Sequence, residues 1–241
     1  MDAAWKDASF RILQIECADG THQRINTRLL TDASARLRRE LEFNPDLLIQ
    51  PYVNLNDCEI TGDGFNLVKQ WPVDGSFDWE GSCRDTMHDI DMLCKAYRTG
   101  WDLEITSDFL DMVMDRLIEY VTTEGLLADG HMTDDANADD IYYLLLDTFA
   151  VGSPGRRFIL DWLLHSELDQ DEATERILDV MKQDRVLSRE IFFERCLSRR
   201  PERAPWATDL CAYHLHLDNE PTCQGRRAKA QGQTQLLDDE G

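Results

Sequence analysis

The sequence is poor in positive charge. Its 241 residues include 25 Lys and Arg against 47 Asp and Glu, which gives a formal charge of −22. Because nucleic-acid affinity comes mainly from cations that meet phosphates, such a chain would repel a polyanion overall. An anionic membrane surface would repel it for the same reason. The charge therefore predicts no nucleic-acid partner and no membrane partner, and it favours basic surfaces on partner proteins.

Long apolar runs are also missing. No window reaches 18 uninterrupted apolar residues, so no transmembrane helix is expected. Residues 1–7 have neither a basic start nor an apolar core, which argues against a secretory signal. The seven cysteines are odd in number and mostly scattered, so reduced thiols are expected. These features predict a cytoplasmic or nuclear protein that is not secreted.

Signatures of catalysis are missing as well. The sequence has no Gly-x-Ser-x-Gly elbow, no Gly-x4-Gly-Lys phosphate loop, no Gly-x-Gly-x-x-Gly turn and no His-Glu-x-x-His pair. Four histidines are isolated along the chain: His22, His88, His131 and His165. We therefore predict a protein that is not an enzyme and has no catalytic or cofactor-binding residue. An enzyme whose site is assembled from distant residues is the alternative.

The first third of the chain has the pattern of a mixed α+β domain. Residues 10–17 are rich in β-branched and apolar side chains, and Asp19-Gly20 is a strong hairpin signal before a return strand at 21–25. Apolar residues then recur at helical spacing over 29–37. A short strand is expected at 52–55, and a short helix at 65–71 that Pro72 would stop.

The remainder of the chain has a helical pattern. We expect an apolar helical face over 87–97 with Gly100 as the C-cap, and a second helix that begins at Ser107. Ser153 and Pro154 have the residue types that begin a helix. Further helices are expected at 141–149, 171–182 and 188–197. Residues 128–140 hold five Asp and no basic residue, which predicts a solvated linker.

Three stretches of the first 125 residues are similar to the BTB/POZ domain in its divergent fungal form. The first is Asp19-Gly20-Thr21 followed by 25–37, which resembles the family's hairpin and its "His-Lys-x-Leu-Leu … Ser-x-x-Leu" helix. The second is 53–57 with 65–71, and the third is 93–97 with 109–117. Farther on, 148–160 and the element Cys211-x-Tyr213-His214-x-His216 resemble the C-terminal half of the fungal proteins. Asn26 and Trp71-Pro72-Val73 depart from the family pattern, in the half that family members use for pairing and partner contacts.

The resemblance implies a BTB/POZ-like small sheet with flanking helices, followed by an all-helical C-terminal extension. It places the BTB/POZ-like domain at 8–125 and the helical extension at 141–223. The charge pattern predicts an acidic linker at 126–140 between them, and the lack of aromatic residues predicts a disordered tail at 224–241. The resemblance also implies a protein–protein interaction module whose partners are other proteins. Self-association as a homodimer and substrate-adaptor work for a cullin-type ubiquitin ligase are the narrower roles that it suggests.

Four residues near the C-terminus form a candidate zinc site: Cys211, His214, His216 and Cys223. Two thiolates and two imidazoles are a permitted tetrahedral zinc set, and a metal would close a segment that has little apolar content. This pattern supports the alternative function of a zinc-containing regulatory protein or an unrecognised enzyme that uses the Cys/His cluster. The competing interpretation is two free thiols and two surface histidines.

Two charged segments have weaker functional interpretations. Arg156-Arg157 follows a helix start and could bind an anion such as a phosphopeptide, although pairing with carboxylates such as Asp161 is favoured. The aspartates of 129–140 are the residue type that binds calcium. Their adjacent pairs lack the alternation, the central Gly and the final Glu of an EF-hand loop, which favours the solvated linker.

Overall fold

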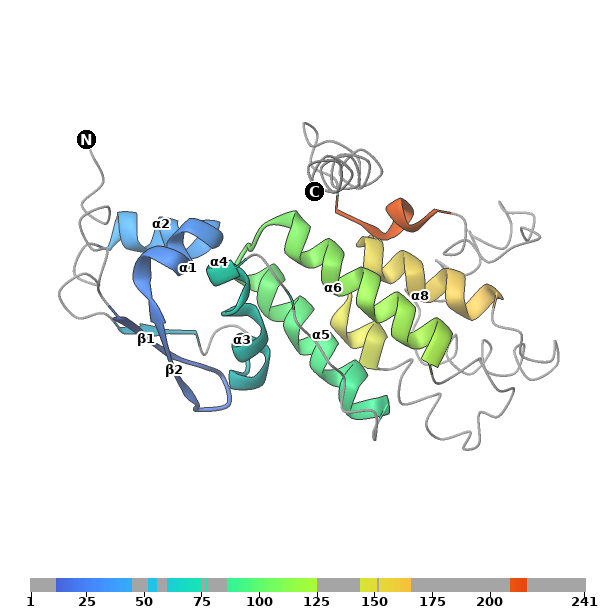
Figure 1. Ribbon diagram of the computed structural model, residues 1–241, viewed down its shortest axis with the longest axis horizontal. Helices are drawn as coiled ribbons and strands as arrows, with labels where there is room; N and C mark the ends of the chain where they lie inside the picture. The colour runs from blue at the N-terminus through green and yellow to red at the C-terminus, as the bar shows by residue number, and fades with distance from the viewer. Residues whose placement is uncertain are drawn as a thin grey trace, which may run out of the picture. The chain divides into compact units, whose positions relative to one another are not determined.

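A computed structural model describes residues 12–44, 52–55, 60–74, 77, 86–124, 144–150, 152–165 and 209–215 (Figure 1). The chain divides into two compact units, Met1–Ile159 and Leu160–Gly241. The first unit contains a three-stranded sheet together with helices, so the α+β class predicted from the sequence is confirmed. The expected helices at 171–182 and 188–197, the linker at 128–140 and the tail at 224–241 lie outside the described residues.

The sheet has the strand order β2-β1-β3. Strands β1 (Ile12–Glu16) and β2 (His22–Asn26) form the predicted antiparallel hairpin. Strand β3 (Tyr52–Asn54) pairs with β1 in parallel, with Gln14 opposite Tyr52. Leu13 and Ile15 are fully buried, whereas Ile12, the first residue of β1, is exposed. This alternation shows that one face of the sheet packs on the core and the other does not.

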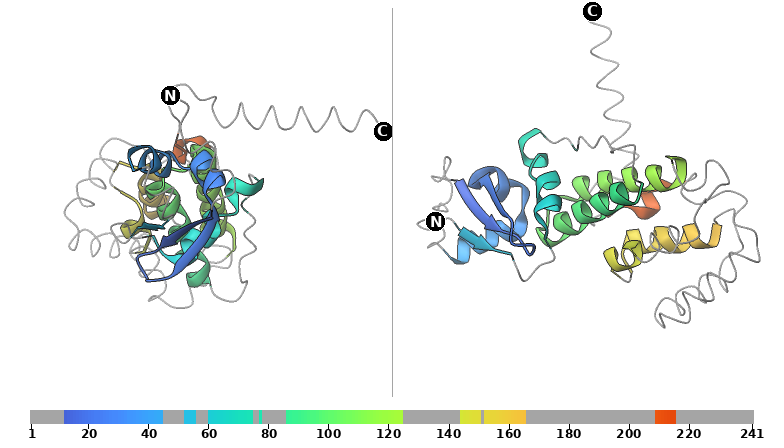
Figure 2. Two further views of the ribbon diagram at one scale, coloured as in Figure 1. Left: turned by 90° about the vertical axis from the view of Figure 1, so that its left-hand side faces the viewer. Right: turned by 90° about the horizontal axis from the view of Figure 1, so that it is seen from below.

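The hairpin turn is held against the start of helix α3 (Gly62–Val68). Gly20 has a φ of 75°, the left-handed conformation that glycine adopts without strain. The carboxylate of Asp19 accepts the backbone N–H of Thr21 at 3.0 Å and the backbone N–H of Gly62 at 2.8 Å. Helix α3 also contacts β2, and Figures 1 and 2 show it beside the hairpin. The Asp-Gly turn therefore joins the sheet to a helix that begins 43 residues after Asp19.

The helix predicted over 29–37 is two helices, which corrects the sequence-based expectation. Helix α1 (Thr27–Ala33) ends at Ser34, and helix α2 (Ala35–Phe43) begins there. Ser34 has an extended backbone, and its hydroxyl accepts the Leu37 N–H at 3.1 Å as an N-cap. The same hydroxyl donates to the Leu103 carbonyl. The break between the two helices thus places a hydrogen-bond donor against the Leu103 carbonyl, 69 residues away in the sequence.

The short helix expected at 65–71 also divides. Helix α3 ends at Val68, and a separate turn, α4 (Trp71–Asp74), follows. Pro72 does not stop a helix at this point, because it lies in the first turn of α4, where a proline has no backbone hydrogen bond to lose. The Trp71 indole N–H donates to the Thr106 hydroxyl at 3.3 Å, so the turn is fixed to the segment before helix α6.

Helices α5 (Thr86–Asp102) and α6 (Ser107–Glu119) run side by side in antiparallel directions (Figures 1 and 2). The start of α6 at Ser107 confirms the prediction, and a π-helical turn, η3 (Tyr120–Glu124), continues it. Gly100 does not end α5, which runs on to Asp102. A Cβ atom on Gly100 would lie 2.6 Å from the ring of Phe109, so the glycine permits close approach of the two helices.

Replacing Gly100 with alanine should therefore destabilise the protein by about 1 kcal/mol, even though alanine is the better residue in a helix interior. Phe109 is fully buried and has little freedom to move away from the new methyl group. Urea unfolding followed by circular dichroism measures the change. The same substitution in a Phe109→Leu background should cost less. A gain in stability from Gly100→Ala alone would contradict this packing.

Residues 144–148 are helical, and they belong to the same compact unit as α5. The ring of Phe149 meets the ring of Tyr97 edge-on, with centroids 4.7 Å apart. Arg98 donates to both the backbone carbonyl and the carboxylate of Asp147. Helix α8 (Pro154–His165) then begins as predicted, because the Ser153 hydroxyl accepts the Arg156 N–H at 3.2 Å.

In the second unit, the described residues are the end of α8 and residues 209–215, which include a short 3-10 turn, η4 (Leu210–Tyr213). Trp162 is buried, and the buried Tyr213 donates its hydroxyl to Asp161 at 2.7 Å. Across the described ranges of both units, no helix has the combination of length and apolar character that crossing a bilayer requires.

Candidate functional site

The structure describes half of the predicted zinc set. Cys211 is partly exposed in η4, where the carboxylate of Asp209 accepts its backbone N–H at 3.0 Å. His214 follows η4 and is only 6% exposed, so its interpretation as a surface histidine is wrong. His216 and Cys223 lie outside the described residues. Within the described residues, no three His, Cys, Asp or Glu side chains are grouped closely enough to hold a metal ion.

The zinc site therefore stays a prediction. About one zinc per chain in protein purified without chelator, lost in the Cys211→Ser/His214→Ala variant, would support it. All four ligands together would close the tetrahedral shell, which is the arrangement of a structural site rather than a catalytic one.

Arg156 has a structural position. Arg156 is only 4% exposed, and its guanidinium donates to the backbone carbonyl of Leu146 at 2.9 Å. The contact joins the start of α8 to the helical segment before it. Arg157 is exposed on the same helix. A buried guanidinium is poorly placed to receive an anion from solvent, so the phosphopeptide interpretation gains no support. The calcium candidate at 129–140 lies outside the described residues.

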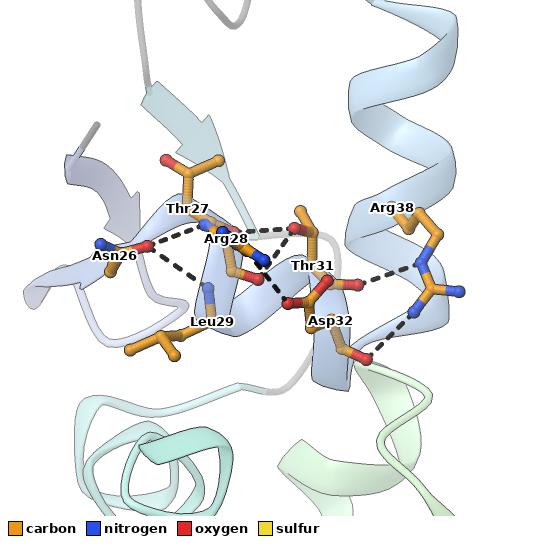
Figure 3. A network of polar contacts seen from close by, with 7 residues as sticks. All are labelled: Asn26, Thr27, Arg28, Leu29, Thr31, Asp32 and Arg38. Carbon is orange, nitrogen blue, oxygen red and sulfur yellow. Dashed lines mark hydrogen bonds and ion pairs between the residues drawn. The ribbon is translucent and has the colours of Figure 1, made fainter. Parts of the chain in front are cut away.

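The two departures from the family pattern have clear local roles. The side chain of Asn26 is the N-cap of α1 and accepts the backbone N–H groups of Arg28 at 2.9 Å and Leu29 at 3.3 Å (Figure 3). Asparagine is among the best N-cap residues, so it suits the abrupt change from β2 to α1. The Trp71 ring lies tilted against Phe109, with centroids 5.7 Å apart.

The outer face of the sheet carries two exposed apolar side chains. Ile12 is 53% exposed on β1, and Tyr52 is 41% exposed on β3. Since Gln14 is opposite Tyr52, Ile12 is two residues from direct pairing with it and projects from the same face. Standard strand spacing places their Cα atoms roughly 8 Å apart. The Tyr52 hydroxyl donates to the Glu16 carboxylate, so this apolar pair has an acidic neighbour.

Helix α2 is linked to the turn between α5 and α6 by a pair of charged residues. The guanidinium of Arg39 donates to both carboxylate oxygens of Glu104, one of them at 2.7 Å. This hydrogen bonding lowers the pKa of Glu104 and raises that of Arg39. Glu104 has a φ of 50°, a left-handed backbone that is uncommon for a residue with a side chain. Its carbonyl also accepts the Ala35 N–H at 3.2 Å.

A second carboxylate links α5 to the end of α6. Asp89 is fully buried, and Tyr120 donates its hydroxyl to it at 2.7 Å. Neither this contact nor the Arg39–Glu104 pair is among the features predicted from the sequence. Asp89 directly precedes Ile90 and lies near Leu93 in the sequence, both on the apolar face of α5. An acidic side chain at this position is ordinarily exposed to solvent, so its burial is not evident from the sequence.

Asp19 gives the hairpin turn a pH dependence. Burial alone would raise its pKa, but hydrogen bonds from the Thr21 hydroxyl and from the backbone of Gly62 and Thr21 outweigh burial and lower it. A carboxylate whose pKa is lower in the folded state stabilises the fold above its unfolded pKa of about 4, and the contribution is lost as pH falls through the folded value.

The Asp19→Asn variant should accordingly be less stable than the parent chain at pH 7, and the difference should shrink below about pH 4. Urea unfolding at a series of pH values from 3 to 7 measures both free energies. Asp63→Asn is a suitable control, because Asp63 is exposed at the start of α3 beside Gly62. A constant gap between the parent chain and Asp19→Asn over the whole range would contradict the role of the charge.

No protein-family model matches the chain, and no curated protein matches it.

Proposed function

We propose that the chain is a protein-interaction module of the BTB/POZ type and not an enzyme. The observation that carries the proposal is the apolar pair Ile12 and Tyr52 on the outer face of a sheet whose other face is buried in the core. Exposed apolar and aromatic side chains are the usual anchors of protein–protein contacts. They lie on β1 and β3, in the half that the resemblance links to partner contacts.

The order of elements adds support for the type of module. A hairpin is followed by α1 and α2, then by β3, α3 and α4, and then by the antiparallel pair α5 and α6. The motifs that resemble the BTB/POZ family occur in this order. A shared fold does not by itself imply a shared function, so the binding proposal depends on the exposed residues Ile12 and Tyr52. Self-association and contact with a cullin-type scaffold are the two narrower roles within this proposal.

The test compares the full chain with the Ile12→Asp/Tyr52→Asp variant. Light scattering over a range of concentrations measures self-association, and titration with a purified cullin N-terminal domain measures scaffold binding. We expect at least one of the two interactions in the parent chain and its loss in the variant. Val73→Asp is the matched control, since Val73 is 65% exposed on α4, away from the sheet.

Two results would overturn the proposal. One is a parent chain that stays monomeric at high micromolar concentration and binds no scaffold. The other is an interaction that the double variant retains in full. Circular dichroism of each variant would confirm that the sheet and helices are intact.

A further inference from the structure

The positive charge of this acidic chain is concentrated in one short window. Residues 22–39 contain five arginines and a single acidic residue, Asp32. The remaining residues hold 20 basic and 46 acidic side chains, so they carry a formal charge of −26. The window forms β2, α1 and the first half of α2. The formal charge of the window is therefore opposite in sign to that of the rest of the chain.

Three of these arginines have donors directed away from the core. Arg24 is exposed on β2 opposite Gln14, and it makes no polar contact with other described residues. Arg28 has a side chain that is 59% exposed, and its Nε lies 3.7 Å from the Asp32 carboxylate. Arg38 donates through Nε and one Nη to the carbonyls of Thr31 and Asp32, each at 3.0 Å, which leaves the other Nη group (Figure 3).

These three residues are named here the arginine surface. Figure 3 shows Arg28 and Arg38 approaching Asp32 from two different helices. Arg24 precedes Arg28 by four residues, which limits the distance between their Cα atoms to about 14 Å. Asp32 is the single acidic residue of the window 22–39, and Glu16 of β1 lies on the same sheet face as Arg24. The Nε of Arg28 lies 3.7 Å from the Asp32 carboxylate, which is too long for a hydrogen bond. No hydrogen bond joins the terminal Nη groups of Arg28 to the other described residues, so these groups can donate to a ligand.

We infer that the arginine surface binds a short acidic segment of a partner protein, an inference that rests on the proposed interaction function and names the chemistry of the partner. Guanidinium groups bind carboxylates in a planar, bidentate geometry, which suits Asp and Glu side chains of a peptide. Screening in physiological salt limits the repulsion from distant acidic residues to about 8 Å, so a short segment meets mainly the local positive field. A nucleic acid extends beyond the window and meets the acidic remainder of the chain.

The test uses the full chain and a fluorescein-labelled octapeptide of alternating Asp and Glu. Fluorescence anisotropy at 50 mM salt measures its Kd. Arg24→Glu and Arg28→Glu should each weaken binding on the order of fivefold, and the double variant should weaken it further. Arg116→Glu is the matched control: Arg116 is 47% exposed on α6, outside the arginine surface, and its reversal should leave the Kd nearly unchanged. Raising the salt concentration should weaken binding by the parent chain.

Four results would overturn the inference. The first is no binding of the octapeptide, and the second is an equal loss in the Arg116→Glu control. The third is tighter binding of a dT12 oligonucleotide than of the octapeptide. The fourth is self-association that the Arg24→Glu/Arg28→Glu variant abolishes, which would assign the surface to a second copy of this chain and not to a separate partner. Binding that depends on Ile12 and Tyr52 is measured independently, so either proposal can fail while the other stands.

Discussion

Phe109→Ala is expected to lower the free energy of unfolding by about 4 kcal/mol. Phe109 is fully buried, and its ring contacts Trp71 and Phe77, each with centroids 5.7 Å away. It also fills the space beside Gly100 on α5. Removing the ring leaves a cavity where α4, α5 and α6 meet, and these elements have little freedom to close it. Urea unfolding followed by circular dichroism measures the loss.

Arg116→Ala is the control for this substitution, because it changes an exposed residue of the same helix. Its salt bridge with Glu119 is exposed, so the expected loss is less than about 0.5 kcal/mol. A loss below about 1 kcal/mol in Phe109→Ala would show that the ring does not occupy the centre of this packing.

Phe149→Ala is expected to cost about 3 kcal/mol and to lower the stability of the entire first compact unit. Phe149 is buried against Tyr97 of α5, and its ring lies where a Cβ atom on Gly155 would be. The segment around it is thus packed between α5 and the beginning of α8. We expect a single unfolding transition at a lower urea concentration, with tryptophan fluorescence and circular dichroism changing together.

The matched control is Asp147→Ala, two residues earlier, whose carboxylate is 78% exposed. Loss of its salt bridge with Arg98 should cost about 0.5 kcal/mol. Two separate transitions in Phe149→Ala, one of them at the parent midpoint, would contradict a single cooperative unit.

The domain boundary at residue 125 expected from the resemblance stays a prediction, since residues 125–143 are not among those described.

Local chemistry explains the elements that the sequence predicted well. Asp19-Gly20 requires a tight turn, and Leu13 and Ile15 alternate with polar residues as a half-buried strand requires. The apolar positions of 109–121 recur at helical spacing and are buried in α6 and η3. Ser153 and Pro154 begin α8 by short-range capping. In each case the residues that decide the structure lie within one or two turns of each other.

Partners that are far away in the sequence explain the errors. Ser34 divides a continuous helical pattern because its hydroxyl bonds to Leu103, and nothing near Ser34 indicates that partner. Gly100 has the residue type of a C-cap, but its role is to admit Phe109. At both positions the residue type suggests a local role, whereas a contact with a residue far away in the sequence decides the structure.

The candidate surfaces were predictable only in part. The sequence pointed to the first half of the chain, but the parallel pairing of β1 with β3 is what brings Ile12 near Tyr52. Periodicity alone does not specify which strands pair or in what register. The pairing of Arg39 with Glu104 spans 65 residues and has no sequence signature. For the zinc candidate, His216 and Cys223 lie outside the described residues.

Ser34 bonds to Leu103 and also forms an isolated antiparallel bridge with Ile105, and this pairing has a consequence for how the protein is made. The junction of α1 and α2 acquires its partners only after about 70 further residues have been synthesised. Until then the nascent hairpin lacks the α5–α6 turn, and closing so long a loop carries an entropic cost that slows folding. We expect the emerging N-terminal third to remain sensitive to proteases on the ribosome until α6 has left the exit tunnel.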